Sequence, residues 1–312
     1  MLDNPFFQGV ICLLAGSVLW GFSGACTQYL FAHYAVSSLF ITVVRMVGAG
    51  LLFLAYLLAA QRSRVRTLLS DRVERQRLAA FGVLGLFACQ LTYIVTIGYT
   101  NAGTATVLQS LCTVIVLAVT CAQVHRHPYR LEIIGVVCAL AATVLIATKG
   151  DLGTLNMPLL GLVWGLGTAA AESVYVLLSG PLTARWGSLV VTGLGMLAGG
   201  VAAFAVFAAS GAVFAATGGA AGQPVAVPVL GADGWLMLVL IVVFGTFGAF
   251  GLFIHGLSIV GGVRGTLLGT MEPVAATCFS ALWLGTAFGW ADWAGLVLMV
   301  AMVFLVTLQK AR

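Results

Sequence analysis

Long apolar stretches repeat along the whole chain, separated by short polar or glycine-rich connections. Each stretch has about 20 residues, which is the length that a helix needs to cross the hydrocarbon layer. Lipid offers no partner for backbone N–H and C=O groups, so such stretches are expected to be α-helices. The pattern predicts an all-α membrane protein with ten transmembrane helices. The expected spans are 9–31, 37–60, 78–98, 103–123, 131–148, 158–179, 187–209, 234–255, 262–284 and 291–309.

The two halves of the chain resemble each other. A shift of 160 residues places Leu111–Val114 on Met271–Val274, and shifts of 158, 152 and 150 match the remaining spans in order. Since each half holds an odd number of spans, the second half enters the membrane from the opposite side. We therefore expect two inverted five-helix repeats, residues 1–150 and 151–312. Such repeats surround a site near the midplane that opens to either face in turn.

Charge is sparse and one-sided. Only 7% of the residues are charged, which excludes an ordinary soluble domain, and the net charge is +5. Cytoplasmic loops carry the excess of Lys and Arg, so this asymmetry predicts that both termini face the cytoplasm, in a bacterial cytoplasmic membrane. The charge then reflects topology, and the expected partners are membrane lipids rather than nucleic acid. The basic residues on this side are Arg62, Arg64, Arg66, Arg72, Arg75, Arg77, Arg126, Arg130, Arg185, Lys310 and Arg312, against Lys149 on the other.

Signatures of metal, nucleotide and cofactor chemistry are missing from the sequence. The seven cysteines fall inside predicted spans without CxxC spacing and are expected to pack as small hydrophobes. Neither a phosphate-binding P-loop nor an HExxH motif is present. The sequence therefore predicts no cofactor, no metal site and no enzymatic activity.

Polar residues inside the spans are the candidate site, because a charge at membrane depth costs at least about 2.5 to 3.5 kcal/mol. Trp164, Thr168, Glu172 and Tyr175 follow each other at helical spacing and share one face of the sixth span. The matching face of the first span holds Trp20 and Ser23, among others. The two stripes predict opposite walls of a central cavity. The alternative is that Glu172 only bonds to a neighbour such as Arg45.

Further candidates come from four other spans. Gln90 and Tyr93 share a face of the third span, and their counterparts in the eighth lead toward His255, for which a substrate role and a structural role compete. We assign Arg45, Glu272 and Pro273 to gating or ion pairing. Glu272 directly precedes Pro273, which interrupts the ninth span, and Arg45 is the basic residue within the second span. The predicted substrate-binding residues are Trp20, Ser23, Gln90, Tyr93, Trp164, Thr168, Glu172, Tyr175 and His255.

Several short motifs together resemble the drug/metabolite transporter superfamily, specifically its ten-helix EamA branch. They include Leu19–Gly21, Arg45, Gly269–Val274 and the Leu-Gly pair that ends the ninth span. The chain departs from the family pattern at Thr113, where a proline is usual, and at Thr286, where an acidic residue is common. The resemblance implies a secondary transporter with its site between the halves, often an exporter of amino acids or related metabolites.

Two transport hypotheses remain open. In the first, the protein exports amino acids, with Glu172 holding the α-ammonium group and aromatic rings covering the apolar part. In the second, it imports choline or another quaternary ammonium, held in a cage of Trp20, Trp164, Tyr93 and Tyr175. A membrane enzyme or scaffold is the alternative from another class, which the sequence disfavours. The expected partner is a small molecule, and the expected assembly is a monomer or a homodimer.

Overall fold

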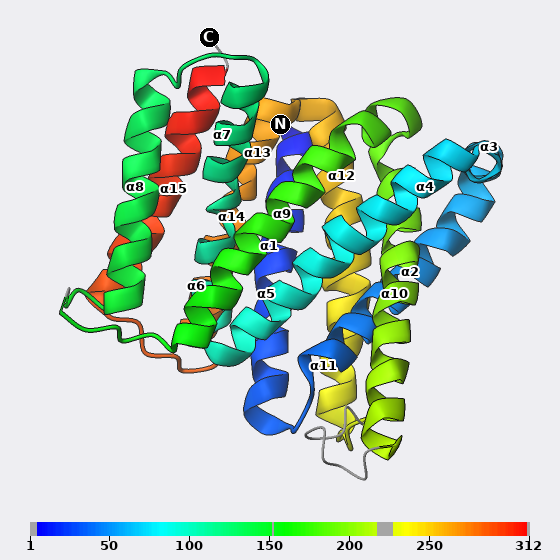
Figure 1. Ribbon diagram of the computed structural model, residues 1–312, viewed down its shortest axis with the longest axis horizontal. Helices are drawn as coiled ribbons and strands as arrows, with labels where there is room; N and C mark the ends of the chain where they lie inside the picture. The colour runs from blue at the N-terminus through cyan, green and yellow to red at the C-terminus, as the bar shows by residue number, and fades with distance from the viewer. Residues whose placement is uncertain (1–4, 152, 217–226, 311–312) are drawn as a thin grey trace.

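The computed structural model describes residues 5–151, 153–216 and 227–310, and these residues form helices joined by short connections, with no strand among them (Figure 1). The first half contains α1 (Pro5–His33), α2 (Ser38–Ala60), α3 (Arg62–Ser70), α4 (Arg72–Ala80), η1 (Phe81–Phe87), α5 (Ala88–Tyr99), α6 (Ala102–Gln109), α7 (Cys112–Gln123) and α8 (Arg130–Thr148).

The second half follows the same order. It contains α9 (Leu159–Trp186), α10 (Ser188–Ala216), α11 (Ala232–Val242), η2 (Val243–Gly248), α12 (Ala249–Val260), α13 (Gly262–Gly269), α14 (Met271–Leu282) and α15 (Trp290–Lys310).

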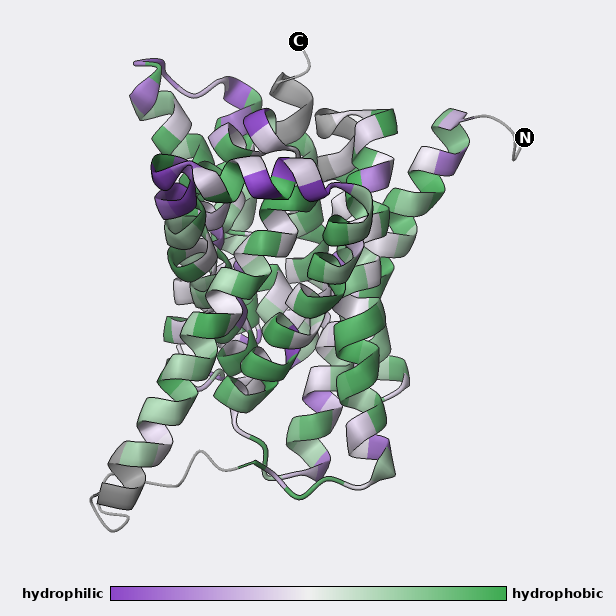
Figure 2. Ribbon diagram, turned by 90° about the vertical axis from the view of Figure 1, so that its right-hand side faces the viewer, coloured by the Kyte–Doolittle hydropathy of each residue, from purple (hydrophilic) through white to green (hydrophobic). Residues whose placement is uncertain are grey.

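The predicted fold class is confirmed. Eight helices of the described chain are long and apolar enough to cross a membrane, and two shorter apolar helices, Leu267–Leu282 and Trp290–Val306, complete the ten. Hydrophobic residues cover the flanks of the bundle, and hydrophilic ones gather toward its ends (Figure 2). The start of α1 and the end of α15 lie at the same end of the bundle as α3 (Figures 1 and 2).

Contacts between the halves hold the bundle together. Helix α1 packs against α12 and α14, α2 against α10, α5 against α9, and α8 against α15. Small residues permit the closest approaches, as expected where helices pack in lipid without a hydrophobic driving force. Gly199 of α10, for example, lies against the backbone carbonyl of Gly82 in η1, where a Cβ would not fit.

The backbone irregularities occur in matching places. The third and eighth spans contain the π-helical segments η1 and η2, and the fourth and ninth spans are each broken in the middle. The first break lies at Ser110 (φ −61°, ψ −16°) and Leu111, and the second at Thr270 (φ −64°, ψ −9°). Pro273 stands in the first turn of α14, just after the second break. Thr113 stands at the matching place in α7, so a break of this geometry also forms without proline.

Two predicted connections contain more helix than expected. The basic segment 61–77 is largely α3 and the start of α4, and buried Glu74 in the first turn of α4 accepts hydrogen bonds from Arg77 (3.1 Å), Arg185 (2.9 Å) and Trp186 (2.8 Å). The expected span 187–209 also ends later than predicted, because α10 continues through Ala216; residues 217–226 lie outside the described part.

Candidate functional site

A cavity of about 790 Å³ lies between the two halves. Its wall is formed by helices from both repeats and includes the starts of α7 and α14, beside the two helix breaks. The structure brings together at this wall most of the residues predicted from sequence: Trp20, Arg45, Gln90, Tyr93, Glu172, Tyr175, Glu272 and Pro273.

Glu172, on α9, is held by residues of the other half. The thiol of Cys89 on α5 donates to its Oε2 at 2.7 Å, and the amide of Gln109, the last residue of α6, donates to the same oxygen at 3.4 Å. No basic side chain of the described chain lies within 4.0 Å of the carboxylate, so the alternative ion pair with Arg45 does not form in this conformation. Glu172 therefore keeps its second oxygen, Oε1, without a donor among the described residues.

Arg45, on α2, is buried, and among the described residues its side chain makes one hydrogen bond. Its Nε donates to Oγ1 of Thr246 in η2 at 2.9 Å, and this hydroxyl in turn donates to the carbonyl of Ile241 near the end of α11 at 2.8 Å. Within the described residues, its Nη1 has no hydrogen-bond partner. The π-helical segment thus orients one edge of the guanidinium and leaves the other edge free.

Tyr93 and Glu272 lie in the same region of the cavity. Tyr93 is buried and its hydroxyl, which lies close to Gly24, has no partner among the described residues. Glu272 is half-buried at the start of α14 and interacts electrostatically with Arg45 and Tyr93. In the described chain these groups form no ion pair within 4.0 Å. The wall of the cavity therefore carries one cation and two carboxyl groups that are not paired with each other.

Aromatic rings form the apolar part of the wall. Trp20 contacts Phe250 edge-on, with ring centroids 4.9 Å apart, and Phe253 at 4.7 Å. Tyr175 packs against Phe81 at 5.5 Å. Phe250 and Phe253 were not predicted, because an aromatic residue in an apolar span gives no sign of facing a cavity rather than a neighbouring helix.

The cavity does not reach four of the predicted residues. Trp164 and Thr168 share the face of Glu172, but nearer the start of α9, where Thr168 contacts Thr96 of α5 at 3.2 Å. Helices α5 and α6 cover α9 there, so the cavity ends before this level. Ser23 is buried against Gly245, and His255 is exposed away from the cavity. The structure gives no support to a substrate role for these side chains.

One end of the bundle is closed by polar contacts between the halves. Gln28 of α1 accepts from the backbone N–H of Ala102 and from the Ser280 hydroxyl, both at 2.9 Å, and donates to Thr286 at 2.8 Å. Asp233 nearby accepts from the hydroxyls of Tyr29 and Tyr34. The hydrogen bond to Asp233 raises the pKa of Tyr34 above its usual value.

The cavity extends toward the opposite end of the bundle. Its wall there includes Ser179 and Thr183 near the end of α9, Ser188 at the start of α10, and Leu257 near the end of α12. The arginine-rich helix α3 lies at this same end (Figure 2). In this conformation the cavity therefore leads toward the side that the arginine distribution predicts to be cytoplasmic.

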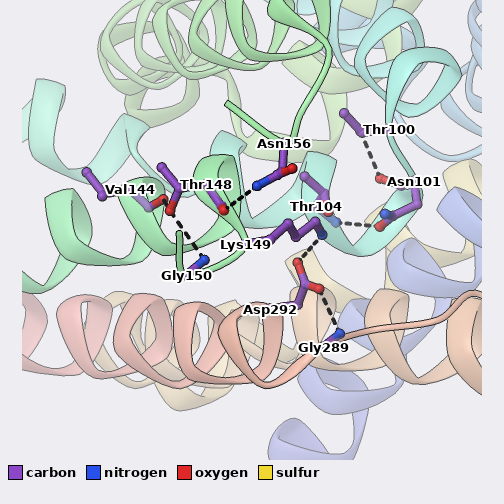
Figure 3. A network of polar contacts seen from close by, with 10 residues as sticks. All are labelled: Thr100, Asn101, Thr104, Val144, Thr148, Lys149, Gly150, Asn156, Gly289 and Asp292. Atoms are coloured by element: carbon purple, nitrogen blue, oxygen red, sulfur yellow. Dashed lines mark hydrogen bonds and ion pairs between the residues drawn. The ribbon is translucent and has the colours of Figure 1, made fainter. Parts of the chain in front are cut away.

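Two further buried acids lie outside the cavity and cap helices. Glu132 in the first turn of α8 pairs with Arg126 through two bonds of 2.8 Å and accepts from the N–H of Tyr129; the pairing raises the pKa of Arg126. Asp292 in the first turn of α15 binds Lys149 and accepts from the N–H of Gly289 at 2.9 Å (Figure 3). Since both acids satisfy helix N-termini, their role is structural.

Comparison with known proteins connects this architecture to a family. The model of the EamA-like transporter family matches residues 7–148 and again residues 159–308. The chain is 31% identical over 307 residues to the uncharacterized inner membrane transporter YicL of Salmonella typhimurium, covering 98% of this chain and 97% of the relative. A protein of known crystal structure shares the fold with a TM-score of 0.64 at 19% identity, over 97% of this chain and 98% of its own.

Proposed function

Because the chain belongs to the EamA-like transporter family, we propose that it is a secondary active transporter that exports amino acids across the cytoplasmic membrane by alternating access. The observation that supports this most directly is the cavity between the two halves. A carboxylate of the second half, Glu172, is held there by Cys89 and Gln109 of the first. A site shared in this way changes its surroundings whenever the halves move relative to each other.

The cavity wall suits a ligand with a cationic head and an apolar side chain. Glu172 keeps one oxygen free of described donors, and an ammonium group supplies the donor that this oxygen lacks. Trp20, Phe250 and Phe253 offer an aromatic surface for the apolar side chain. An α-amino acid with an aliphatic or aromatic side chain carries both of these features.

Alternating access requires two ends that open in turn. The end with Gln28 is closed by its hydrogen bonds to Ser280 and Thr286 of the second half, while the cavity leads toward the end with α3. On the predicted topology this conformation receives substrate from the cytoplasm, as the first step of export requires. Release on the other side then requires the bonds of Gln28 to break and the wall near Ser179 and Ser188 to close.

Choline uptake has less support. The cage proposed for a quaternary ammonium contains Trp164, which is not in the cavity wall, so that Trp20, Tyr93 and Tyr175 remain. A quaternary ammonium also has no N–H to donate to the free oxygen of Glu172. Choline is nevertheless the right competitor, since it carries the positive charge without the carboxylate of an amino acid.

Counterflow in proteoliposomes tests the proposal. Purified protein is reconstituted with an internal excess of one unlabelled compound, and uptake of the labelled compound is followed for leucine, phenylalanine, lysine and choline. We expect saturable exchange of leucine and phenylalanine and no competition by choline. Exchange of choline alone contradicts the proposed substrate class. The direction of transport is measured separately. For an exporter, cells that make the protein should lose preloaded labelled amino acid faster than cells that do not make it.

A further inference from the structure

Unpartnered polar atoms in the protein interior point to a second binding group. Among the described residues, the buried side-chain atoms without a hydrogen-bond partner are Ser23 Oγ, Arg45 Nη1 and Tyr93 OH. Buried donors are nearly always paired, and an unpaired one carries its full desolvation cost. Arg45 and Tyr93 both line the central cavity, and each is only 4% exposed. Two donors without an acceptor therefore lie beside one cavity, and both are covered in this conformation, so an acceptor reaches them when the surrounding side chains move.

The guanidinium of Arg45 is held in place for such an acceptor. Thr246 accepts from Nε at 2.9 Å and fixes the plane of the group. No carboxylate of the described chain pairs with Arg45 within 4.0 Å, although Glu272 interacts with it electrostatically. A buried arginine with one edge free matches the planar, two-oxygen geometry of a carboxylate. The phenol of Tyr93 adds a third donor at the same wall.

We propose that Arg45 and Tyr93 form a carboxylate-binding subsite, separate from the ammonium site at Glu172, so that the cavity recognises both charged ends of a free amino acid. This inference rests on the proposed function and deepens it. It also changes the sequence-based assignment of Arg45 from gating to substrate binding. Each charged group of the ligand then supplies a hydrogen-bond partner that the described residues of the protein do not provide.

The balance of charges limits the substrate further. Among the described residues, the charged groups of the cavity wall are the two carboxyl groups of Glu172 and Glu272 and the guanidinium of Arg45. A neutral zwitterion adds no net charge to it. A second carboxylate on the ligand would face the two acids with no further cation among the described wall residues. The subsite therefore selects monocarboxylic amino acids over aspartate and glutamate.

The test compares ligands that differ only at the carboxylate. Competition with phenylalanine counterflow is measured for phenylalanine, phenylalaninol, which has an alcohol in place of the carboxylate, and glutamate, in wild type and in Arg45→Gln, Arg45→Lys and Tyr93→Phe. Tyr56→Phe is the matched control, because Tyr56 is exposed on the outside of α2 and its variant loses the same hydroxyl. Folding is checked by the thermal transition in detergent.

In wild type we expect phenylalanine to compete at least about tenfold better than phenylalaninol, and glutamate to compete least. Arg45→Gln is expected to raise the KM for phenylalanine about tenfold or more while phenylalaninol changes less than about twofold, with partial recovery in Arg45→Lys. Tyr93→Phe produces a smaller change of the same kind, about threefold, and Tyr56→Phe none.

Four outcomes overturn the subsite. Equal competition by phenylalanine and phenylalaninol in wild type removes the carboxylate from recognition while amino-acid transport still stands. If Arg45→Gln weakens the binding of phenylalanine and phenylalaninol equally, Arg45 does not bind the carboxylate and acts through its interaction with Glu272. If Arg45→Gln does not fold, an unchanged KM in Tyr93→Phe decides against the subsite. If wild type exchanges no amino acid at all, the proposed function fails and this inference fails with it.

Discussion

The two halves of this transporter share a backbone but differ in the chemistry that they bring to the cavity. Both contain a π-helical segment in the third span of the repeat and a break in the fourth. Yet the shift that aligns the first and sixth spans places Trp20 on Glu172, and the shift for the fourth and ninth places Cys112 on Glu272. The carboxyl groups of the wall belong to the second half, and the arginine belongs to the first.

The backbone and the side chains of the two halves meet two different requirements of transport. Alternating access needs two halves that can exchange conformations, which a repeated backbone supplies. Recognition of an asymmetric ligand needs different groups at the two sides of the site, and side-chain divergence supplies them. At Glu132 and Asp292, where the halves agree in charge, the acid caps a helix; at Glu172 and Glu272, where the halves differ, the acid lines the cavity.

The largest effect on transport is expected when an acid of the second half is neutralised. We expect Glu172→Gln to lower amino-acid exchange by about 100-fold or more, because the amide keeps the shape but offers no negative charge to the ammonium. Counterflow in proteoliposomes measures the loss. Asp151→Asn, the same change in an exposed loop, is the control and should retain wild-type exchange. A fully active Glu172→Gln protein would refute the role given to this residue.

The two helix-capping acids, Glu132 and Asp292, are expected to affect the stability of the protein and not its binding of substrate. Glu132→Gln is expected to lower the thermal transition in detergent by several degrees, because Glu132 is fully buried and binds Arg126 through two oxygens. Asp292→Asn should lower it less, since the Lys149 side chain remains 39% exposed and can be solvated by water. In both variants the KM for substrate should stay within about twofold of wild type. An Asp292 variant that is the less stable of the two contradicts this order.

Much of this architecture is predictable from sequence, because lipid imposes a simple rule on helix length and polarity. The spans and the polar helix face around Glu172 were predicted from that rule, and the repeat was predicted from the similarity of the two halves. The neutral partners do not: Cys89, Gln109 and Thr246 act through hydrogen bonds that depend on packing between distant spans. Periodicity identifies a helix face but not how far a cavity extends along it, so it could not show that the cavity of this conformation stops short of Trp164 and Thr168.

A smaller effect is expected at the closed end, where Gln28 joins the halves. Gln28→Leu removes three hydrogen bonds and should shift the population toward an outward-open state by about tenfold. Cys89 and Cys112 line the cavity and report on this change. A membrane-impermeant maleimide should reach them from the α3 side in wild type and from both sides in the variant, as mapped by mass spectrometry. Unchanged sidedness of labelling in Gln28→Leu would show that other contacts close this end.

The smallest effect is expected where the halves differ only in how they form the same break. Thr113 occupies the position of Pro273, and its N–H bonds to the carbonyl of Ser110 at 3.1 Å just after the first break. Proline removes this one bond but fits the first turn of a helix, as Pro273 does in α14. Thr113→Pro should therefore change the thermal transition by no more than a few degrees and leave counterflow near the wild-type rate. The contrasting change Ala118→Pro, in the interior of α7, should unfold the protein or abolish transport, because a proline there removes an intrahelical bond and clashes with the preceding turn. If both prolines are equally harmful, the two breaks are not equivalent, and the two repeats are symmetric only in outline.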